Sequence, residues 1–192
     1  MKKQRKNIAV FASHGGSNLQ AVINAIKSGV LNTRVAVVIS NNSGAFALER
    51  ARREGIPSYH ISERVCRNAD ETIHKVLCEH QADIVFLAGY LKKIGASVLK
   101  VYEGSIYNIH PSLLPKFGGK GMHGLNVHEA VLKSGDAVTG VTIHRVTAEY
   151  DDGDIISQRV VPVLPGDTPQ TLAARVLEAE HILIVETLRA IT

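Results

Sequence analysis

The stretch from Asn7 to Asn18, NIAVFASHGGSN, decides the fold class of this 192-residue chain. An uninterrupted apolar run opens it, which is typical of a strand buried on both faces of a sheet, and we expect that strand over Asn7–Ala12. After two glycines the chain enters Ser17–Lys27, where apolar residues recur at helical spacing. The stretch therefore predicts strand, tight turn and helix, the first unit of a parallel α/β sheet.

The same alternation continues through the first half of the chain. Further strands are expected at residues 35–40, 58–60 and 83–88, and helices at 45–54 and 69–78. Strands and helices that alternate at this spacing form right-handed units around a mostly parallel sheet. We therefore predict a Rossmann-like α/β domain with helices on both faces of the sheet.

The second half changes character after a strand expected at residues 105–109. Residues 111–124 are rich in Gly and Pro and are predicted to be irregular. The remaining elements are expected to be a helix at 125–133, an antiparallel hairpin of 138–146 with 155–161, and a closing helix at 168–190. Thr168 suits the N-cap of that helix and Pro169 its first position. One domain over residues 1–192 accounts for all of these elements.

Charge and composition exclude several classes of function. The net charge is +4, but four of the 22 basic residues lie in residues 1–6, and the remaining 18 balance the 18 acidic ones. We therefore expect a flexible basic tail over residues 1–6 and no nucleic-acid partner, since no global basic field remains. The sequence has no apolar run of membrane-spanning length and no signal peptide, so we expect no membrane partner. Cys66 and Cys78 are too few for a disulfide framework or a zinc cage, which favours the cytoplasm.

Ser13–Asn18 is the first candidate for ligand binding. Its glycines allow close backbone approach, and the following helix offers free N–H groups that suit a phosphate. The spacing matches neither the dinucleotide fingerprint nor the nucleoside-triphosphate loop. The structural alternative is a tight turn in which Ser17 or Asn18 caps the helix.

Asn108 and His110 form the second candidate. In a strand they point to the same face, and they would lie at its carboxyl end, where open α/β sheets bind ligands. An amide beside an imidazole can hold a developing oxyanion and move a proton. The alternative is a core histidine with satisfied hydrogen bonds beside a turn.

Asp151-Asp152-Gly153-Asp154 is the third candidate. The carboxylates could bind a metal ion or simply solvate a hairpin turn, and the EF-hand spacing is missing, so we expect no metal. One carboxylate close to His110 would raise the pKa of the imidazole and keep it cationic.

Taken together, these stretches resemble the phosphoribosylglycinamide formyltransferases, a folate-dependent enzyme family, over Ile8 to about Leu188. The motifs that carry the resemblance are Gly16–Ala21, Ser40-Asn41 with 45–51, Leu87–Tyr90, Asn108–Pro115, Gly140–Gly153 and Glu180-His181. The resemblance implies formyl transfer from 10-formyltetrahydrofolate to the amine of 5-phosphoribosylglycinamide in de novo purine biosynthesis. It implies catalysis by Asn108, His110 and Asp151: the amine attacks directly, and Asn108 and His110 stabilise a tetrahedral intermediate.

The resemblance also implies the binding residues. Gly16, Ser17 and Asn18 would hold the substrate phosphate, and Glu180 would meet the ribose hydroxyls or the glycinamide amide. The residues implied for the folate co-substrate are Leu91, Lys92, Lys93, Ile94, Asn108 and Arg67, with Arg64 competing for the place of Arg67. Small-molecule substrates, no metal and a monomer or homodimer complete this expectation.

The chain departs from the family pattern in a longer, Gly-rich segment, 116–124, which we expect to form a mobile flap. His123 and His128 are expected to be ordinary surface histidines, and Leu177 stands where the family often has a polar phosphate contact. Alternative functions are a sugar-nucleotide formyltransferase, a formyltetrahydrofolate hydrolase or a non-catalytic phosphometabolite-binding module. The hydrolase and the tRNA formyltransferase carry additional domains, for which we expect no room in 192 residues.

Overall fold

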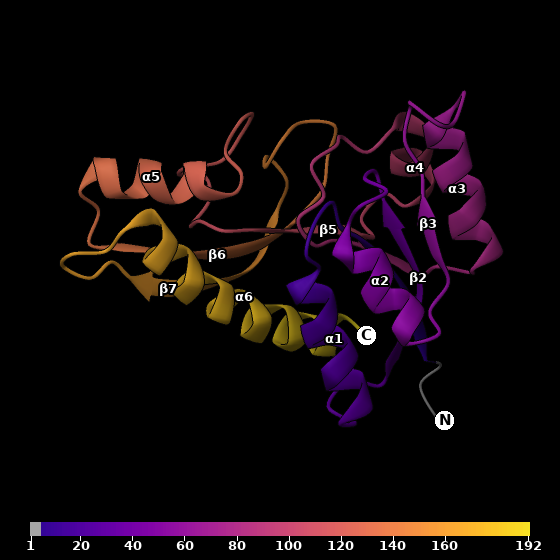
Figure 1. Ribbon diagram of the computed structural model, residues 1–192, viewed down its shortest axis with the longest axis horizontal. Coiled ribbons are helices and arrows are strands. Elements are labelled where there is room, and N and C mark those ends of the chain that lie inside the picture. The colour runs from indigo at the N-terminus through magenta and orange to yellow at the C-terminus, as the bar shows by residue number, and fades with distance from the viewer. Residues whose placement is uncertain (1–4) are drawn as a thin grey trace.

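The computed structural model describes residues 5–192, in which seven strands and six helices alternate along the chain as far as β6, which β7 follows directly (Figure 1). In chain order they are β1 (Lys6–Phe11), α1 (Ser17–Lys27), β2 (Thr33–Ser40), α2 (Phe46–Arg53), β3 (Ser58–His60), α3 (Ala69–Glu79), β4 (Ile84–Leu87), α4 (Ala96–Val101), β5 (Ile106–His110), α5 (Leu125–Ser134), β6 (Val138–Arg145), β7 (Ile155–Pro162) and α6 (Pro169–Ile191).

All seven strands belong to one sheet in the order β3-β2-β1-β4-β5-β6-β7. The pairs among β1 to β5 are parallel, whereas β6 runs antiparallel to both β5 and β7. The strand order reverses between β1 and β4, and such switch points open a crevice at the carboxyl ends of the strands. The predicted α/β class, the mostly parallel sheet and the antiparallel C-terminal hairpin are confirmed.

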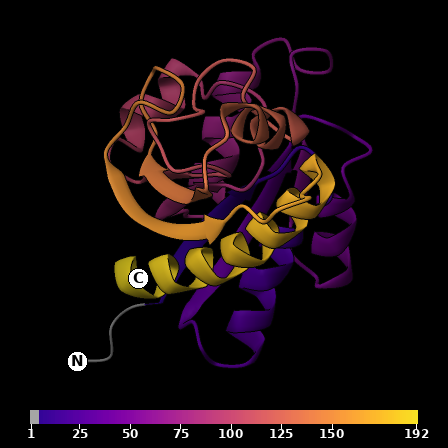
Figure 2. The same ribbon diagram turned by 90° about the vertical axis from the view of Figure 1, so that its left-hand side faces the viewer.

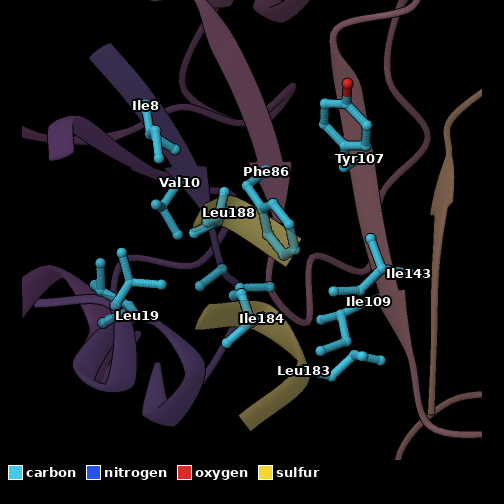
Figure 3. Packing of buried hydrophobic residues seen from close by; sticks show 14 of the residues in the cluster. Ile8, Val10, Leu19, Phe86, Tyr107, Ile109, Ile143, Leu183, Ile184 and Leu188 are labelled. Carbon is cyan, nitrogen blue, oxygen red and sulfur yellow. The ribbon is translucent and has the colours of Figure 1, made fainter. Parts of the chain in front are cut away.

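Each face of the sheet buries its own hydrophobic core, because side chains alternate along a strand. Ile8 and Val10 of β1 pack with α1 and α6, as Figure 3 shows for Leu19, Ile184 and Leu188. Ala9 and Phe11 of the same strand pack on the opposite face with residues of α3 and α4. Figure 2 shows α6 running along the side of the sheet that α1 also covers, and these two helices are in contact.

Helix α4 is an element that the sequence reasoning missed. It is six residues long, and its first amides are capped by the carboxylate of Asp70, which accepts from Ser97 N at 2.8 Å. Asp70 belongs to the first turn of α3, so this cap exists only once α3 and α4 lie side by side. Gly95 is required at the junction, since a Cβ there would lie 2.1 Å from the Asp70 carboxyl carbon.

The predicted basic tail is wrong at its last two residues. Lys6 begins β1 and its Nζ lies 3.2 Å from Asp83 Oδ1, while Arg5 Nε donates to Thr33 O at 2.8 Å. The other predicted tail residues, 1–4, lie outside the described residues. Within residues 5–192, no helix has the length and apolarity that crossing a membrane requires.

Candidate functional site

The carboxyl end of β5 carries Asn108 and His110, and both face the turn that follows β6. Asp151 of that turn lies between them: its Oδ2 is 3.5 Å from His110 Nδ1, and its Oδ1 is 3.4 Å from Asn108 Nδ2. His110 is 4% exposed. The structure therefore brings the three predicted catalytic residues together, although 41 positions separate His110 from Asp151 in the sequence.

Asp151 is held in place by its backbone and by the Gly-rich segment. Its φ of 54° lies in the left-handed region, which costs free energy for a non-glycine residue and is frequent at functional sites. Gly119 N donates to Asp151 Oδ2 at 2.9 Å. Burial by itself raises the pKa of Asp151, but three effects outweigh burial and lower it: contact with His144, the positive charge that His110 carries when it is protonated, and the hydrogen bond from the Gly119 amide. Asp151 is therefore ionised near neutral pH.

His110 differs from the expectation of a cationic ring. Burial lowers its pKa, and the opposing effect of the Asp151 charge is smaller, so the pKa of His110 lies below its ordinary value. Its Nε2 donates to the carbonyl of Phe117 at 2.9 Å, since a carbonyl can only accept. In the neutral ring Nδ1 consequently carries a lone pair, and this nitrogen faces Asp151. The prediction that His110 rests as a cation is wrong, because desolvation outweighs one carboxylate.

His144 of β6 is a site residue that the sequence reasoning missed. Its Nε2 lies 3.1 Å from Asn108 Nδ2 and 3.4 Å from Asp151 Oδ1, and the residue is 2% exposed. The antiparallel register pairs Asn108 with His144 directly. A histidine inside a predicted strand was the available signal, but only the register shows that it faces Asn108.

The loop between β1 and α1 has the shape expected of an anion site. Gly16 has φ 68° and sits at the N-cap of α1, and no side chain caps the helix. Neither Ser17 nor Asn18 therefore acts as the cap. The first N–H groups of α1 remain available to a phosphate oxygen.

Asn18 and Glu180 meet although they lie 162 residues apart. Asn18 Nδ2 donates to Glu180 Oε2 at 2.6 Å, and among residues 5–192 the buried Asn18 Oδ1 has no hydrogen-bond partner. Burial raises the pKa of Glu180 to about 7, against the lowering effect of Asn18. Asn18 and Glu180, which are predicted to bind the same substrate, are thus hydrogen-bonded to each other, and each can accept further hydrogen bonds from a ligand.

A small cavity of about 60 Å³ adjoins the catalytic side chains. The predicted folate residues Lys92, Lys93 and Ile94 line it together with Asn108 and Asp151, while Leu91 lines the next cavity. Among the lining residues, Lys93 Nζ donates to Ala148 O at 3.0 Å and lies 4.9 Å from the centre of the Tyr150 ring. Lys93 therefore ties the segment 146–151 to the opposite wall.

A larger cavity of about 790 Å³ lies on the other side of the segment 90–93. Arg64 lines this cavity with Leu91 and Lys92, whereas Arg67 is not among its lining residues. Of the two arginines considered for the folate, the structure places Arg64 beside the predicted segment.

The Gly-rich segment 116–124 supplies two backbone groups to the site, the Phe117 carbonyl and the Gly119 amide. His123 is exposed as expected, but His128 of α5 is 4% exposed, so its prediction as a surface histidine is wrong. The helical turn that carries His128 faces the core, where Val127 and Val131 are also buried.

Within residues 5–192, no group of three or more His, Cys, Asp or Glu side chains is arranged to hold a metal ion.

Comparison with known proteins gives a consistent family. The sequence profile of the family described as formyl transferase matches residues 6–188. A phosphoribosylglycinamide formyltransferase of Vigna unguiculata, described as chloroplastic, is 45% identical over 195 residues. This match covers 98% of the present chain and 61% of the relative, so the chain spans about three-fifths of that protein's length.

Solved structures extend the comparison to the fold. Glycinamide ribonucleotide transformylase 1 from Geobacillus kaustophilus is 40% identical with a TM-score of 0.90, and the match covers 98% of this chain and 99% of that one. A formyltetrahydrofolate deformylase from Pseudomonas syringae pv. tomato is 28% identical with a TM-score of 0.86. That match covers 97% of this chain and 61% of the deformylase.

Proposed function

The chain belongs to the formyl transferase family, and on this premise we propose that it transfers a formyl group from 10-formyltetrahydrofolate to the amine of 5-phosphoribosylglycinamide, a step of de novo purine biosynthesis. One observation carries the proposal. Asn108, His110 and Asp151 meet at the carboxyl end of β5, and the adjoining cavity is lined by the segment that the resemblance assigns to the folate. A protein that only bound a phosphorylated metabolite would have no use for this trio.

The acceptor is proposed to bind between α1 and α6. The N–H groups of Gly16, Ser17 and Asn18 would hold its phosphate at the start of α1, where the helix dipole also favours an anion. Glu180 lies against Asn18 and would accept from the ribose hydroxyls or the glycinamide amide. The unpartnered Asn18 Oδ1 supports a polar ligand at this point.

The formyl donor is proposed to enter the cavity beside Asn108. Backbone groups of Leu91–Ile94 would pair with the edge of its ring, and Arg64 or Arg67 would meet its anionic tail. Lys93 and Ala148 both line this cavity and are joined by a hydrogen bond, so a movement of the segment 146–151 away from Lys93 would widen the cavity for the ring.

The proposed chemistry is direct attack of the acceptor amine on the formyl carbon. Asn108 donates a hydrogen bond to the oxygen that becomes negative in the tetrahedral intermediate. His110 accepts a proton from the attacking nitrogen at Nδ1, and Asp151 stabilises the resulting cation. His110 then returns this proton to the donor nitrogen as the carbon–nitrogen bond breaks. The amine loses one proton, the donor nitrogen gains one, and no external reagent is consumed.

A direct assay tests the proposal. The protein is mixed with 10-formyltetrahydrofolate in the presence and absence of phosphoribosylglycinamide, and both deformylated folate and formylated acceptor are quantified. We expect loss of the formyl group to depend on the acceptor, with one formylated product per donor consumed. Absence of formylated product would overturn the proposal.

Hydrolysis of the formyl donor is the second candidate, because the deformylase of Pseudomonas syringae pv. tomato shares the fold at 28% identity. The lone pair on His110 Nδ1 and the carboxylate of Asp151 could activate a water molecule in place of the amine. Formate released without acceptor, at a rate equal to that with acceptor, would favour this activity.

A further inference from the structure

His144 takes its place at the site from the regular register between β5 and β6, in which it is the direct antiparallel partner of Asn108. The β6·β7 ladder is irregular at this point: Ile143 pairs with Ser157 and His144 with Ile155, so the additional residue lies on β7. The cross-strand pair of β5 and β6 therefore holds the His144 ring against the Asn108 amide.

The hydrogen bonds of His144 define which nitrogen carries the proton. Nδ1 lies 2.7 Å from the carbonyl oxygen of Arg145, which can only accept, so Nδ1 is protonated. In the neutral ring Nε2 is then an acceptor, and only in the cationic ring would it carry a proton that can be donated to Asp151 Oδ1, 3.4 Å away. A contact of 3.1 Å between Nε2 and Asn108 Nδ2 is a hydrogen bond only in the neutral state, because the amide nitrogen can only donate.

Asn108 Nδ2 carries two N–H groups, and two acceptors at different distances lie within reach of it. His144 Nε2 receives one at 3.1 Å, while Asp151 Oδ1 lies at 3.4 Å, which is long for a hydrogen bond to a carboxylate. The bond to His144 is the firmer one, and the N–H that faces Asp151 can be surrendered to a better acceptor.

We propose that His144 is a positioning residue for formyl transfer: it anchors one N–H of Asn108 so that the other remains directed at the formyl oxygen. Without the anchor, the amide can rotate and present its oxygen, which would repel the developing oxyanion. His144 touches neither substrate in this account and acts only through Asn108. The inference rests on the proposed function, because it names the residue that fixes the orientation of Asn108, the proposed oxyanion donor.

Substitutions at His144 test the proposal through kcat. His144→Leu removes the acceptor, and we expect kcat to fall by about tenfold or more, short of the roughly 10²–10³-fold loss typical of removing an oxyanion donor. The KM of each substrate should change by less than about threefold, because His144 contacts neither substrate and their binding in the ground state is unchanged. His144→Gln places an amide oxygen near the position of Nε2 and should restore most of kcat.

Combining these changes with Asn108→Ala separates positioning from general damage. If His144 acts through Asn108, His144→Leu should lower kcat by less than about twofold in the Asn108→Ala protein, since coupled residues are not additive. The matched control is Thr139→Val, a buried residue of the same strand that is remote from the site and should not change kcat in either background. An equal loss from His144→Leu in both backgrounds would overturn the proposal.

A measurement on the unliganded protein does not depend on activity. The side-chain amide signals of Asn108 are assigned in the ¹⁵N NMR spectrum by their disappearance in Asn108→Ala. We expect His144→Leu to shift one of the two protons and to speed its exchange with solvent, while His144→Gln changes it less. Unchanged signals would overturn the inference. A wild-type protein that shows these signals but makes no formylated acceptor would overturn the proposed function alone.

Discussion

At the scale of single residues, His110 shows burial and charge acting against each other. The ring lies 3.5 Å from a carboxylate, which favours its cation, yet burial is the larger influence and lowers its pKa. The consequence is a ring that rests neutral, accepts a proton during the reaction, and is stabilised as a cation by Asp151 only at that moment. This order of events suits a base better than a permanent charge.

His110→Ala should abolish most of the activity while leaving the fold intact. We expect kcat to fall by about 10²–10³-fold, because the group that accepts the proton from the amine and returns it to the donor nitrogen is lost. Steady-state kinetics measure the loss, and circular dichroism checks the fold. The exposed His123→Ala serves as the matched control. Turnover of His110→Ala at the level of that control would contradict the mechanism.

Asp151→Asn tests the coupling between the carboxylate and the ring. The Asp151 charge raises the pKa of His110 against the effect of burial, so its removal should lower that pKa further. We expect the His110 ring signals to titrate at lower pH in an NMR experiment and kcat to fall by about 10² or more. An unchanged titration of His110 would show that the two groups are not coupled.

At the scale of elements, the junction of β1 and α1 requires a particular backbone. Gly16 has φ 68°, and a Cβ at this position would lie 2.7 Å from Ala47 Cβ of α2. Ala47 N in turn donates to His14 O at 3.0 Å, which holds α2 against the loop. The glycine therefore serves both the turn and the close approach of two helices.

Gly16→Ala should damage this junction, whereas Gly15→Ala should not. We expect Gly16→Ala to lower the free energy of unfolding by about 1–3 kcal/mol through strain and to raise the KM of the phosphorylated acceptor. A Cβ on Gly15 has nothing within 4 Å, so its effect should stay within about 0.5 kcal/mol. Urea unfolding of both variants measures the contrast. Equal losses of unfolding free energy in the two variants would contradict the strain expected at Gly16.

At the scale of the whole molecule, α6 returns across the sheet and brings Glu180 to the loop that follows β1. Burial there raises the pKa of Glu180 to about 7 from an ordinary value of 4.5. Between these values the folded state binds more protons than the unfolded state, so this group makes the free energy of unfolding fall as pH rises from 4.5 to 7. Ionisation of the buried Glu180 carboxyl in α6 therefore lowers the free energy of unfolding at neutral pH.

Glu180→Gln should remove this destabilisation, because glutamine does not ionise and its side-chain oxygen can still accept a hydrogen bond from Asn18. In the unliganded protein we expect the variant to be more stable than the wild type at pH 8, by on the order of 2–3 kcal/mol, with little difference at pH 4. Thermal unfolding at both pH values measures the difference. A stability difference that is the same at pH 4 and pH 8 would contradict the raised pKa.

The sequence by itself determined the order of the elements other than α4, and the local chemistry of Asn108 and His110. Apolar runs and helical spacing placed β1 and α1, and the Thr168-Pro169 pair placed the start of α6, because these signals arise from neighbouring residues. The side chains of Asn108 and His110 share a face for the same reason, since strand geometry is local.

Only the tertiary structure decided which distant groups meet and what charge they carry. Asp70 caps α4, His144 faces Asn108 and Glu180 joins Asn18 because elements far apart in the sequence pack side by side. The neutral state of His110 depends on how completely the folded chain removes water from the ring. Strand register and desolvation are properties of the assembled sheet, and no local stretch of the sequence specifies either one.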